Sequence, residues 1–168
     1  MTIDVFAADE QKDEPVDTMR WVRLAKEVLA AEGVKGEVEL SMLFVDEHAI
    51  AELNERFLDE TGPTDVLAFP MDDHISEGGR SPDSGGSGPG VNPEPTSEAP
   101  TMLGDLVLCP AVAKRNAAGA SHGYDDEMAL LVVHGILHLL GMDHADAEEA
   151  TAMQRREREL LGRFHKQP

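Results

Sequence analysis

Three histidine residues fall within eleven positions of one another in the stretch HGILHLLGMDH, from His134 to His144. His134 and His138 are four positions apart, so on a helix both side chains project from one face. Gly141 can adopt a positive φ, which allows the chain to leave the helix and bring His144 back toward the same point. Three neutral imidazole nitrogens leave a fourth coordination position open, as in catalytic zinc sites.

The alternative interpretation is a core segment whose histidines are hydrogen-bonded to nearby groups. Burying three imidazoles among leucines is costly unless each one finds a partner, so the spacing favours a metal. Structural zinc sites are usually closed by four ligands, often thiolates, and this chain has only Cys109. The sequence therefore predicts one catalytic zinc ion per chain, whereas Cys109 reads as a small buried hydrophobic residue.

The spacing H-x-x-x-H-x-x-G-x-x-H is also that of the metzincin metallopeptidases. Those enzymes carry a glutamate directly after the first histidine as general base, and here that position is Gly135. Met142 and Met153 have no sequence context that would support the Met-turn of those enzymes. A metallopeptidase is thus disfavoured, although zinc could still activate water for another hydrolysis.

Four segments together resemble the YbeY-type endoribonucleases, the bacterial metal-dependent enzymes of ribosomal RNA maturation. Besides HGILHLLGMDH, they are GPTDVLAFPMD (residues 62–73), LGDLVLC (residues 103–109) and HGYDDEMALLVVHG (residues 122–135). The segments lie in the order typical of the family and cover most of residues 43–158. Such a set is far more specific than an isolated pair of histidines.

The resemblance implies a zinc-dependent single-strand endoribonuclease that acts in small-subunit (16S) rRNA maturation and ribosome quality control. It implies one zinc ion on His134, His138 and His144. The implied partners are rRNA or pre-rRNA and the small ribosomal subunit with its basic proteins. A ribosome-associated maturation factor with weak or no catalysis is the alternative.

One position departs from the family pattern. Many members carry an arginine six residues before the threonine of TDVLSF, and this chain has Leu58 there. Because phosphoryl transfer benefits from a cation near the developing charge, Arg56, Lys114 and Arg115 are candidate substitutes. A solvated surface charge is the alternative for each of them.

Further polar residues could serve the site. Asp143 precedes the third histidine and is a candidate proton acceptor, while His122 lies just before the metal-binding helix and is a candidate for a substrate or structural hydrogen bond. Asp65 and Asp105 could orient a histidine ligand or cap a turn. The remaining histidines lie in polar contexts typical of surface residues: His48, His74 and His165.

The elements that would carry these residues follow from periodicity. Their mixture predicts an α+β single domain over residues 1–168, with a small mixed β-sheet covered by helices and the zinc site on a central helix and the turn after it. We expect strand 64–70 to pair with strand 103–109, with a disordered insert at 74–100 between them, because 15 of residues 78–100 are Gly, Pro or Ser. The other expected strands are 3–7 and 38–45, and the expected helices are 18–32, one capped by Asp46, 110–118, 127–140 capped by Asp125 or Asp126, and 147–162.

Charge and hydropathy limit the environment and the partners. The chain carries 33 acidic against 14 basic residues, a net charge of −19, which disfavours a broad RNA-binding face but suits basic protein partners. No stretch has the length and hydropathy of a membrane span, and the N-terminus lacks the features of a secretory signal. We therefore predict a cytoplasmic protein without membrane contact.

Overall fold

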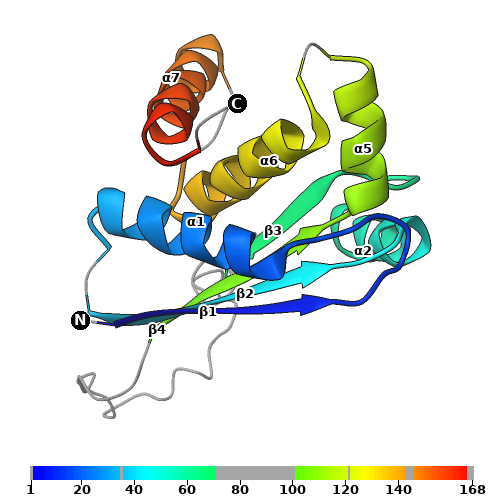
Figure 1. Cartoon of the computed structure of the whole chain (residues 1–168), viewed down its shortest axis with the longest axis horizontal. Coiled ribbons are helices and arrows are strands. Elements are labelled where there is room, and N and C mark those ends of the chain that lie inside the picture. The colour runs from blue at the N-terminus through cyan, green and yellow to red at the C-terminus, as the bar shows by residue number, and fades with distance from the viewer. Residues whose placement is uncertain (1, 35, 71–100, 121, 143–145, 166–168) are drawn as a thin grey trace.

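A four-stranded sheet forms the base of the fold, and three of its helices are layered over one face (Figure 1). The computed structural model describes residues 2–34, 36–70, 101–120, 122–142 and 146–165. The strands are β1 (Thr2–Asp9), β2 (Glu37–Phe44), β3 (Val66–Pro70) and β4 (Thr101–Leu108). The helices are α1 (Thr18–Ala31), α2 (Glu47–Leu58), α5 (Pro110–Ala118), α6 (Tyr124–Leu139) and α7 (Ala147–Phe164).

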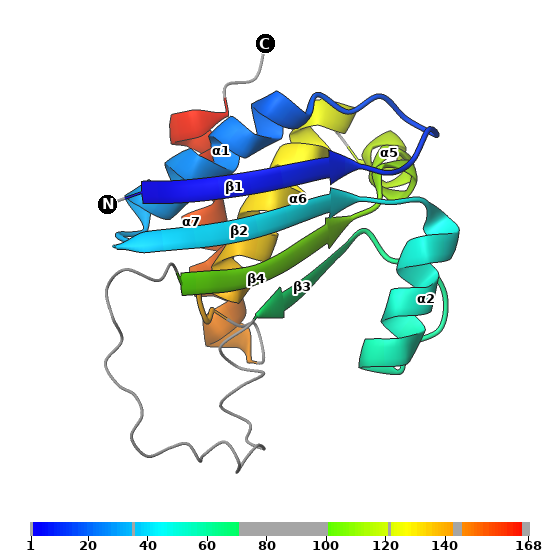
Figure 2. The same ribbon diagram turned by 90° about the horizontal axis from the view of Figure 1, so that it is seen from below.

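The strands lie in the order β1-β2-β4-β3. β1 is parallel to β2 and β2 is parallel to β4, whereas β3 is antiparallel to β4, from Val66 opposite Leu108 to Pro70 opposite Gly104. Figure 2 looks onto the face of this sheet that α1, α6 and α7 leave open. The predicted mixed sheet of an α+β domain and the predicted pairing of the third and fourth strands are both confirmed.

The core lies between the sheet and the helices α1 and α6. In β2 every second residue is buried, including Leu40, Met42 and Phe44, as expected for a strand with one face against a core. On α1 the buried residues recur at helical spacing, for example Trp21, Ala25 and Val28, which places one apolar stripe on the sheet.

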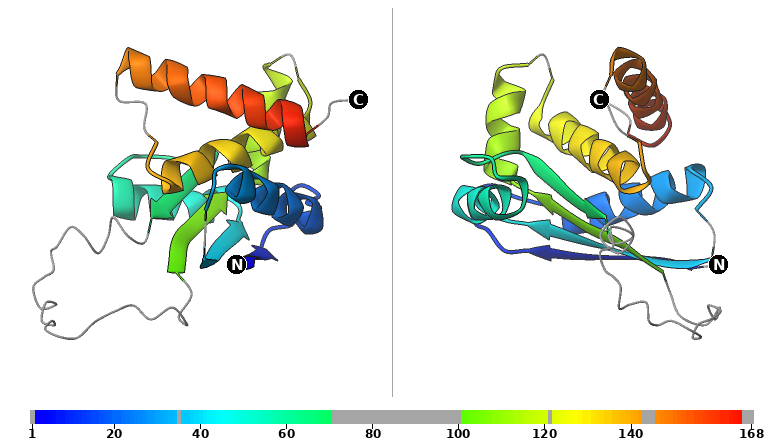
Figure 3. Two further views of the ribbon diagram at one scale, coloured as in Figure 1. Left: turned by 90° about the vertical axis from the view of Figure 1, so that its left-hand side faces the viewer. Right: turned by 180° about the vertical axis from the view of Figure 1, so that it is seen from behind.

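The helix α7 forms a further layer, lying over α6 on the side away from the sheet (Figure 3). Its buried residues Met153 and Leu160 join the same core as α6. The helix α2 packs separately, at the end of the sheet where β3 and β4 meet, and buries Ile50 against Val107 and Cys109. Cys109 is fully buried, as predicted, and burial raises the pKa of its thiol.

Several element boundaries differ from prediction. The strand expected over residues 3–7 extends from Thr2 to Asp9. The helix expected from residue 127 begins at Tyr124 and is capped by Gly123, so Asp125 and Asp126 lie in its first turn. The carboxylate of Asp126 still assists the helix start, since it accepts a hydrogen bond of 3.1 Å from the Gly123 N–H.

Three further predictions concern the cap of α2, the insert between β3 and β4, and membrane spans. The carboxylate of Asp46 accepts a hydrogen bond of 2.9 Å from the Ala49 N–H, which confirms the predicted N-cap of α2. The predicted insert at residues 74–100 lies outside the described residues, and so does His74. In the ranges that the structure describes, every helix is too short or too polar to cross a membrane.

Candidate metal centre and cleft

One face of α6 opens onto a cleft of about 460 Å³. The cleft lies between α6 and β3, with Leu58 of α2 and Glu157 of α7 among the residues that line it. From residue 131 to residue 139 of α6, every residue is buried except His134 and His138, which are partly exposed. The helix thus buries its apolar residues and presents its two histidines to the cleft.

The rings of His134 and His138 lie close together, as their spacing predicts. Their centroids are 4.8 Å apart and their planes meet at 74°. This arrangement follows from helical geometry, because residues four apart lie one turn above each other. Two of the three predicted zinc ligands therefore share one site on the wall of the cleft.

The turn after α6 has the positive φ that the sequence predicts at Gly141. Gly141 has a φ of +104°, its N–H donates to the His138 carbonyl at 3.0 Å, and the Met142 N–H donates to the Leu137 carbonyl at 3.0 Å. This is a Schellman ending, in which glycine reverses the chain after the helix. His144 and Asp143 lie outside the described residues, and within the described ranges no group of three or more potential metal ligands is found.

Glu157 of α7 contacts the His134 ring. Its carboxylate is within hydrogen-bond reach of His134 Nδ1, and the residue is only 7% exposed. Glu157 is not among the site residues predicted from the sequence. A signal was present, because Glu157 lies between Met153 and Leu160 at helical spacing, which puts a carboxylate on the apolar stripe of α7.

Gly135 brings α6 close to the sheet. A Cβ atom at this position would lie 2.2 Å from Cδ1 of Leu106, a fully buried residue of β4. A glutamate at position 135, where a metzincin peptidase carries its general base, would therefore clash with the core. This steric finding weighs further against a metallopeptidase.

A second polar group lies two helical turns from His134, near the N-terminal end of α6. His122 Nε2 is 2.6 Å from Glu127 Oε1, and the Asn116 amide is 3.5 Å from the same carboxylate and donates to Asp65 at 3.2 Å. Glu127 and Asp65 line the cleft. His122 thus makes the structural hydrogen bond that was one of its two predicted roles, through Glu127, which the sequence analysis had not considered.

The predicted cations do not line the cleft. Arg56 is exposed on α2 with its guanidinium carbon 5.9 Å from the centroid of the Phe57 ring. Arg115 pairs with Glu47 at 2.5 Å and holds the pKa of that carboxyl below its ordinary value. The Lys114 ammonium lies 3.5 Å from the carboxylate of Glu14, a residue between β1 and α1. Among the cleft-lining residues that the structure describes there is no lysine or arginine.

Asp105 and the remaining histidines have separate positions. Asp105 lies within β4, opposite Phe69, and is not among the described residues that line the cleft. His48 is exposed, with 86% of its side chain accessible, as predicted. The prediction that His165 is an ordinary surface residue is wrong, because only 4% of its side chain is accessible.

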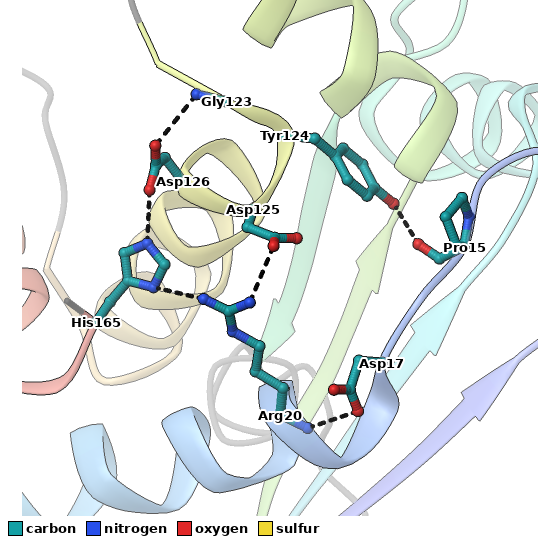
Figure 4. Close-up of polar contacts among 8 residues, drawn as sticks. All are labelled: Pro15, Asp17, Arg20, Gly123, Tyr124, Asp125, Asp126 and His165. Atoms are coloured by element: carbon teal, nitrogen blue, oxygen red, sulfur yellow. Dashed lines mark hydrogen bonds and ion pairs between the residues drawn. The ribbon is translucent and has the colours of Figure 1, made fainter. Parts of the chain in front are cut away.

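His165 is buried because it closes a polar cluster at the start of α6 (Figure 4). Its Nε2 is 2.8 Å from the Asp126 carboxylate, and its Nδ1 is 3.3 Å from the Arg20 guanidinium, which also pairs with Asp125 at 2.9 Å. The hydrogen bond from His165 lowers the pKa of Asp126. Nearby, the Tyr124 hydroxyl donates to the Pro15 carbonyl at 3.0 Å, and burial raises the pKa of Tyr124 to about 12.

Comparison with known proteins identifies the family. The family model described as endoribonuclease YbeY matches residues 6–165. The chain belongs to this family. The resemblance read from the sequence and the enzyme class that it implies, an endoribonuclease, are thereby confirmed.

Individual relatives agree with this assignment. The chain is 48% identical over 161 residues to the endoribonuclease YbeY of Acidothermus cellulolyticus, covering 96% of this chain and 90% of the relative. It is 45% identical over 161 residues to that of Thermobifida fusca, covering 96% and 92%. The fold is also similar to the solution structure of TM1509 from Thermotoga maritima, with a TM-score of 0.53, 23% identity, and coverage of 95% of this chain and 91% of that one.

Proposed function

We propose that the protein is a zinc-dependent single-strand endoribonuclease that acts in small-subunit rRNA maturation and ribosome quality control in the cytoplasm. The observation that carries the proposal is the pair His134 and His138 on the cleft wall of a YbeY-family chain. His144, just beyond the turn at Gly141, would complete the ligand set.

The donor set fits one zinc ion. Zinc accepts imidazole nitrogens, and catalytic sites combine three protein ligands with an open position. Glu157 engages Nδ1 of His134, so Nε2 of the same ring would be the nitrogen that binds the metal. When bound, zinc would supply a Lewis acid for the phosphodiester and a means of activating water at neutral pH.

The residues around the histidines would handle charge and protons. The described lining of the cleft holds the carboxylates of Asp65, Glu127 and Glu157 and no basic side chain. Compensation of the phosphate charge would therefore fall to the metal and to Arg56, two residues before Leu58. Asp143, beside the third ligand, is the proposed proton acceptor, and His122 would act through its hydrogen bond to Glu127.

The edge of the cleft suits an unpaired strand. Phe57 precedes the cleft-lining residue Leu58, is 56% exposed, and is held edge-on by Phe69 with ring centroids 5.4 Å apart. A fixed, exposed ring beside the Arg56 guanidinium offers stacking and positive charge, which is how proteins bind single-stranded nucleic acid. We therefore assign unpaired rRNA or pre-rRNA as the substrate. The net charge of −19 suits basic proteins of the small ribosomal subunit as partners.

The test of substrate binding is Phe57→Ala, with Phe6→Ala as control because both rings are 56% exposed. Loss of a stacking ring costs about 1–3 kcal/mol per base, so we expect Phe57→Ala to weaken binding of a single-stranded oligoribonucleotide by about 5- to 150-fold. Equal affinities for the two variants, measured by fluorescence anisotropy, would contradict the assignment.

The test of catalysis is RNA cleavage by the purified protein before chelation, after chelation and after restoration of zinc. His138→Ala should cleave no faster than the chelated protein, whereas His48→Ala should behave like the wild type because His48 lies on an exposed helix face. Circular dichroism of His138→Ala would verify that it is folded. Cleavage that survives complete chelation would exclude the proposed zinc-dependent activity.

The second candidate is a maturation factor with weak or no catalysis, which the lack of a basic residue in the described cleft lining favours. Its test is co-sedimentation of His138→Ala with small-subunit particles. Retained binding together with retained rRNA maturation would favour this role, while retained binding with failed maturation would favour the enzyme.

A further inference from the structure

We propose that Glu157 is a positioning residue that fixes the orientation and the tautomer of the zinc ligand His134. This inference rests on the proposed zinc site, and it adds a residue of α7 to a centre otherwise built from α6 and the turn after it. Glu157 does not itself bind the metal in this assignment; it acts through His134.

The burial of Glu157 is the first argument. Among residues 151–160 of α7, only Met153, Glu157 and Leu160 are buried, so Glu157 occupies a position where an apolar residue would pack. Burying a carboxylate is expensive unless it is paired. The partner that the structure gives it is Nδ1 of His134, 23 positions earlier in the chain.

The chemistry of the pair is the second argument. A carboxylate only accepts hydrogen bonds, so its contact with Nδ1 places the proton of a neutral imidazole on that nitrogen. The lone pair then belongs to Nε2, the nitrogen that would face a metal. Carboxylates in this position raise the basicity of the ligand and hold its ring, and their loss typically costs about 10- to 100-fold in metal affinity.

The surrounding charges support this specific partnership. Arg156, the neighbouring cation, pairs with Glu32 at 2.5 Å and with Glu159 at 2.9 Å. Glu127, the carboxylate of α6 that lines the cleft, is engaged by His122 at 2.6 Å. Glu157 is thus the carboxylate that the described structure assigns to His134.

The experiment measures zinc affinity by competition with a chromophoric chelator for the wild type, Glu157→Gln and Glu157→Ala. We expect the dissociation constant to rise about 10-fold with Gln, which can still accept a hydrogen bond but is uncharged, and toward 100-fold with Ala. The visible spectrum of the cobalt-substituted protein should also change in both variants, because the ligand field of His134 is altered. Thermal unfolding of the metal-free proteins identifies any loss of folding.

Two matched controls separate positioning from packing. Glu159→Gln removes an exposed carboxylate of the same helix, and His165→Gln breaks another contact between α6 and the end of α7. Both should keep the wild-type zinc affinity and cobalt spectrum. If His165→Gln weakens zinc binding as much as Glu157→Gln, the effect comes from helix packing and the positioning role is wrong.

The outcomes also separate this inference from the proposed function. Unchanged zinc affinity and cobalt spectra in both Glu157 variants would overturn the positioning role while RNA cleavage stands. Weakened zinc binding in a protein that cleaves no RNA would support the positioning role and overturn the nuclease. A wild type that binds no zinc would overturn both.

Discussion

Two histidine–carboxylate pairs join α6 to α7 and the residue after it. In one pair α6 supplies the histidine, and in the other it supplies the carboxylate. In the cleft pair, α6 supplies His134 and α7 supplies Glu157; in the terminal pair, α6 supplies Asp126 and His165 follows directly after α7. Eight positions separate the two α6 residues, and eight separate their two partners. The pairs therefore mark one register of two antiparallel helices.

The pairs differ in which ring nitrogen meets the carboxylate: Nδ1 in the cleft pair and Nε2 in the terminal pair. In the terminal pair Nε2 of His165 meets Asp126 and Nδ1 meets Arg20, so both nitrogens are used within the protein (Figure 4). In the cleft pair the carboxylate meets Nδ1, and the ring borders a cleft beside His138. A histidine paired with a carboxylate thus links two helices in the terminal pair, whereas in the cleft pair the histidine is also a candidate metal ligand.

The largest expected effect comes from a substitution that pushes α6, which carries His134 of the cleft pair, away from β4. Gly135→Ala puts a Cβ atom against the fully buried Leu106, and overpacking of this kind costs about 1–3 kcal/mol. We expect a lower free energy of unfolding and weaker zinc binding, measured by urea denaturation and chelator competition.

The control for this variant is Gly162→Ala on α7, where an added Cβ meets nothing within 4 Å. Alanine is the better helix former by up to about 1 kcal/mol, so this variant should be as stable as the wild type or more so. If Gly135→Ala were as stable as Gly162→Ala, the close approach of α6 to β4 would not require glycine at position 135.

The next effect comes from breaking the terminal pair. His165→Gln removes a buried hydrogen bond to a carboxylate, and we expect a loss of about 1–2 kcal/mol in the free energy of unfolding. Zinc affinity should stay at the wild-type value because the cleft pair is intact. A variant with unchanged stability would remove the structural role that the comparison gives to His165.

The terminal pair should also shape the stability at acid pH. His165 lowers the pKa of Asp126 in the folded state, so this carboxylate contributes stability above its unfolded pKa of about 3.9, and the contribution is lost as the pH falls through the folded value. Asp126→Asn should be less stable than the wild type near pH 6, and the difference should shrink below about pH 4. A constant difference in melting temperature from pH 6 to pH 3 would contradict this linkage.

The smallest effect concerns the tyrosine beside the terminal pair. Tyr124 is the one tyrosine of the chain, and its pKa is raised to about 12. The raised value means that its contribution to stability is complete below the unfolded pKa of about 10 and is lost as the pH rises toward 12. Ultraviolet titration of the folded protein should give a midpoint near 12, whereas a midpoint near 10 would mean that Tyr124 is not held against Pro15.

The sequence predicts the parts of this molecule that depend on local periodicity. The alternation in β2, the cap at Asp46 and the i, i+4 spacing of His134 and His138 are local properties, and the structure agrees with each. The helix end at Gly141 is local as well, because glycine favours the positive φ that the turn requires.

Contacts between residues distant in the chain could not be predicted from the sequence. The partners in the cleft pair are 23 positions apart and those in the terminal pair 39, and the register of α7 against α6 is set by packing over the sheet. His165 looked polar and exposed for this reason. Glu157 could have been noticed as a charge on an apolar stripe, but its partner could not have been named.

The pairing of Pro70 with Gly104 has a consequence for how the chain can vary. β3 ends at Pro70, opposite Gly104, while β4 begins three residues earlier at Thr101, so strand pairing holds the end of β3 within a few residues of the start of β4. Closing a loop costs only about 0.6 kcal/mol more for each doubling of its length. Changes in the length of this connection should therefore alter the free energy of unfolding little, which makes the junction a suitable place to graft a tag or a reporter domain without disturbing α6.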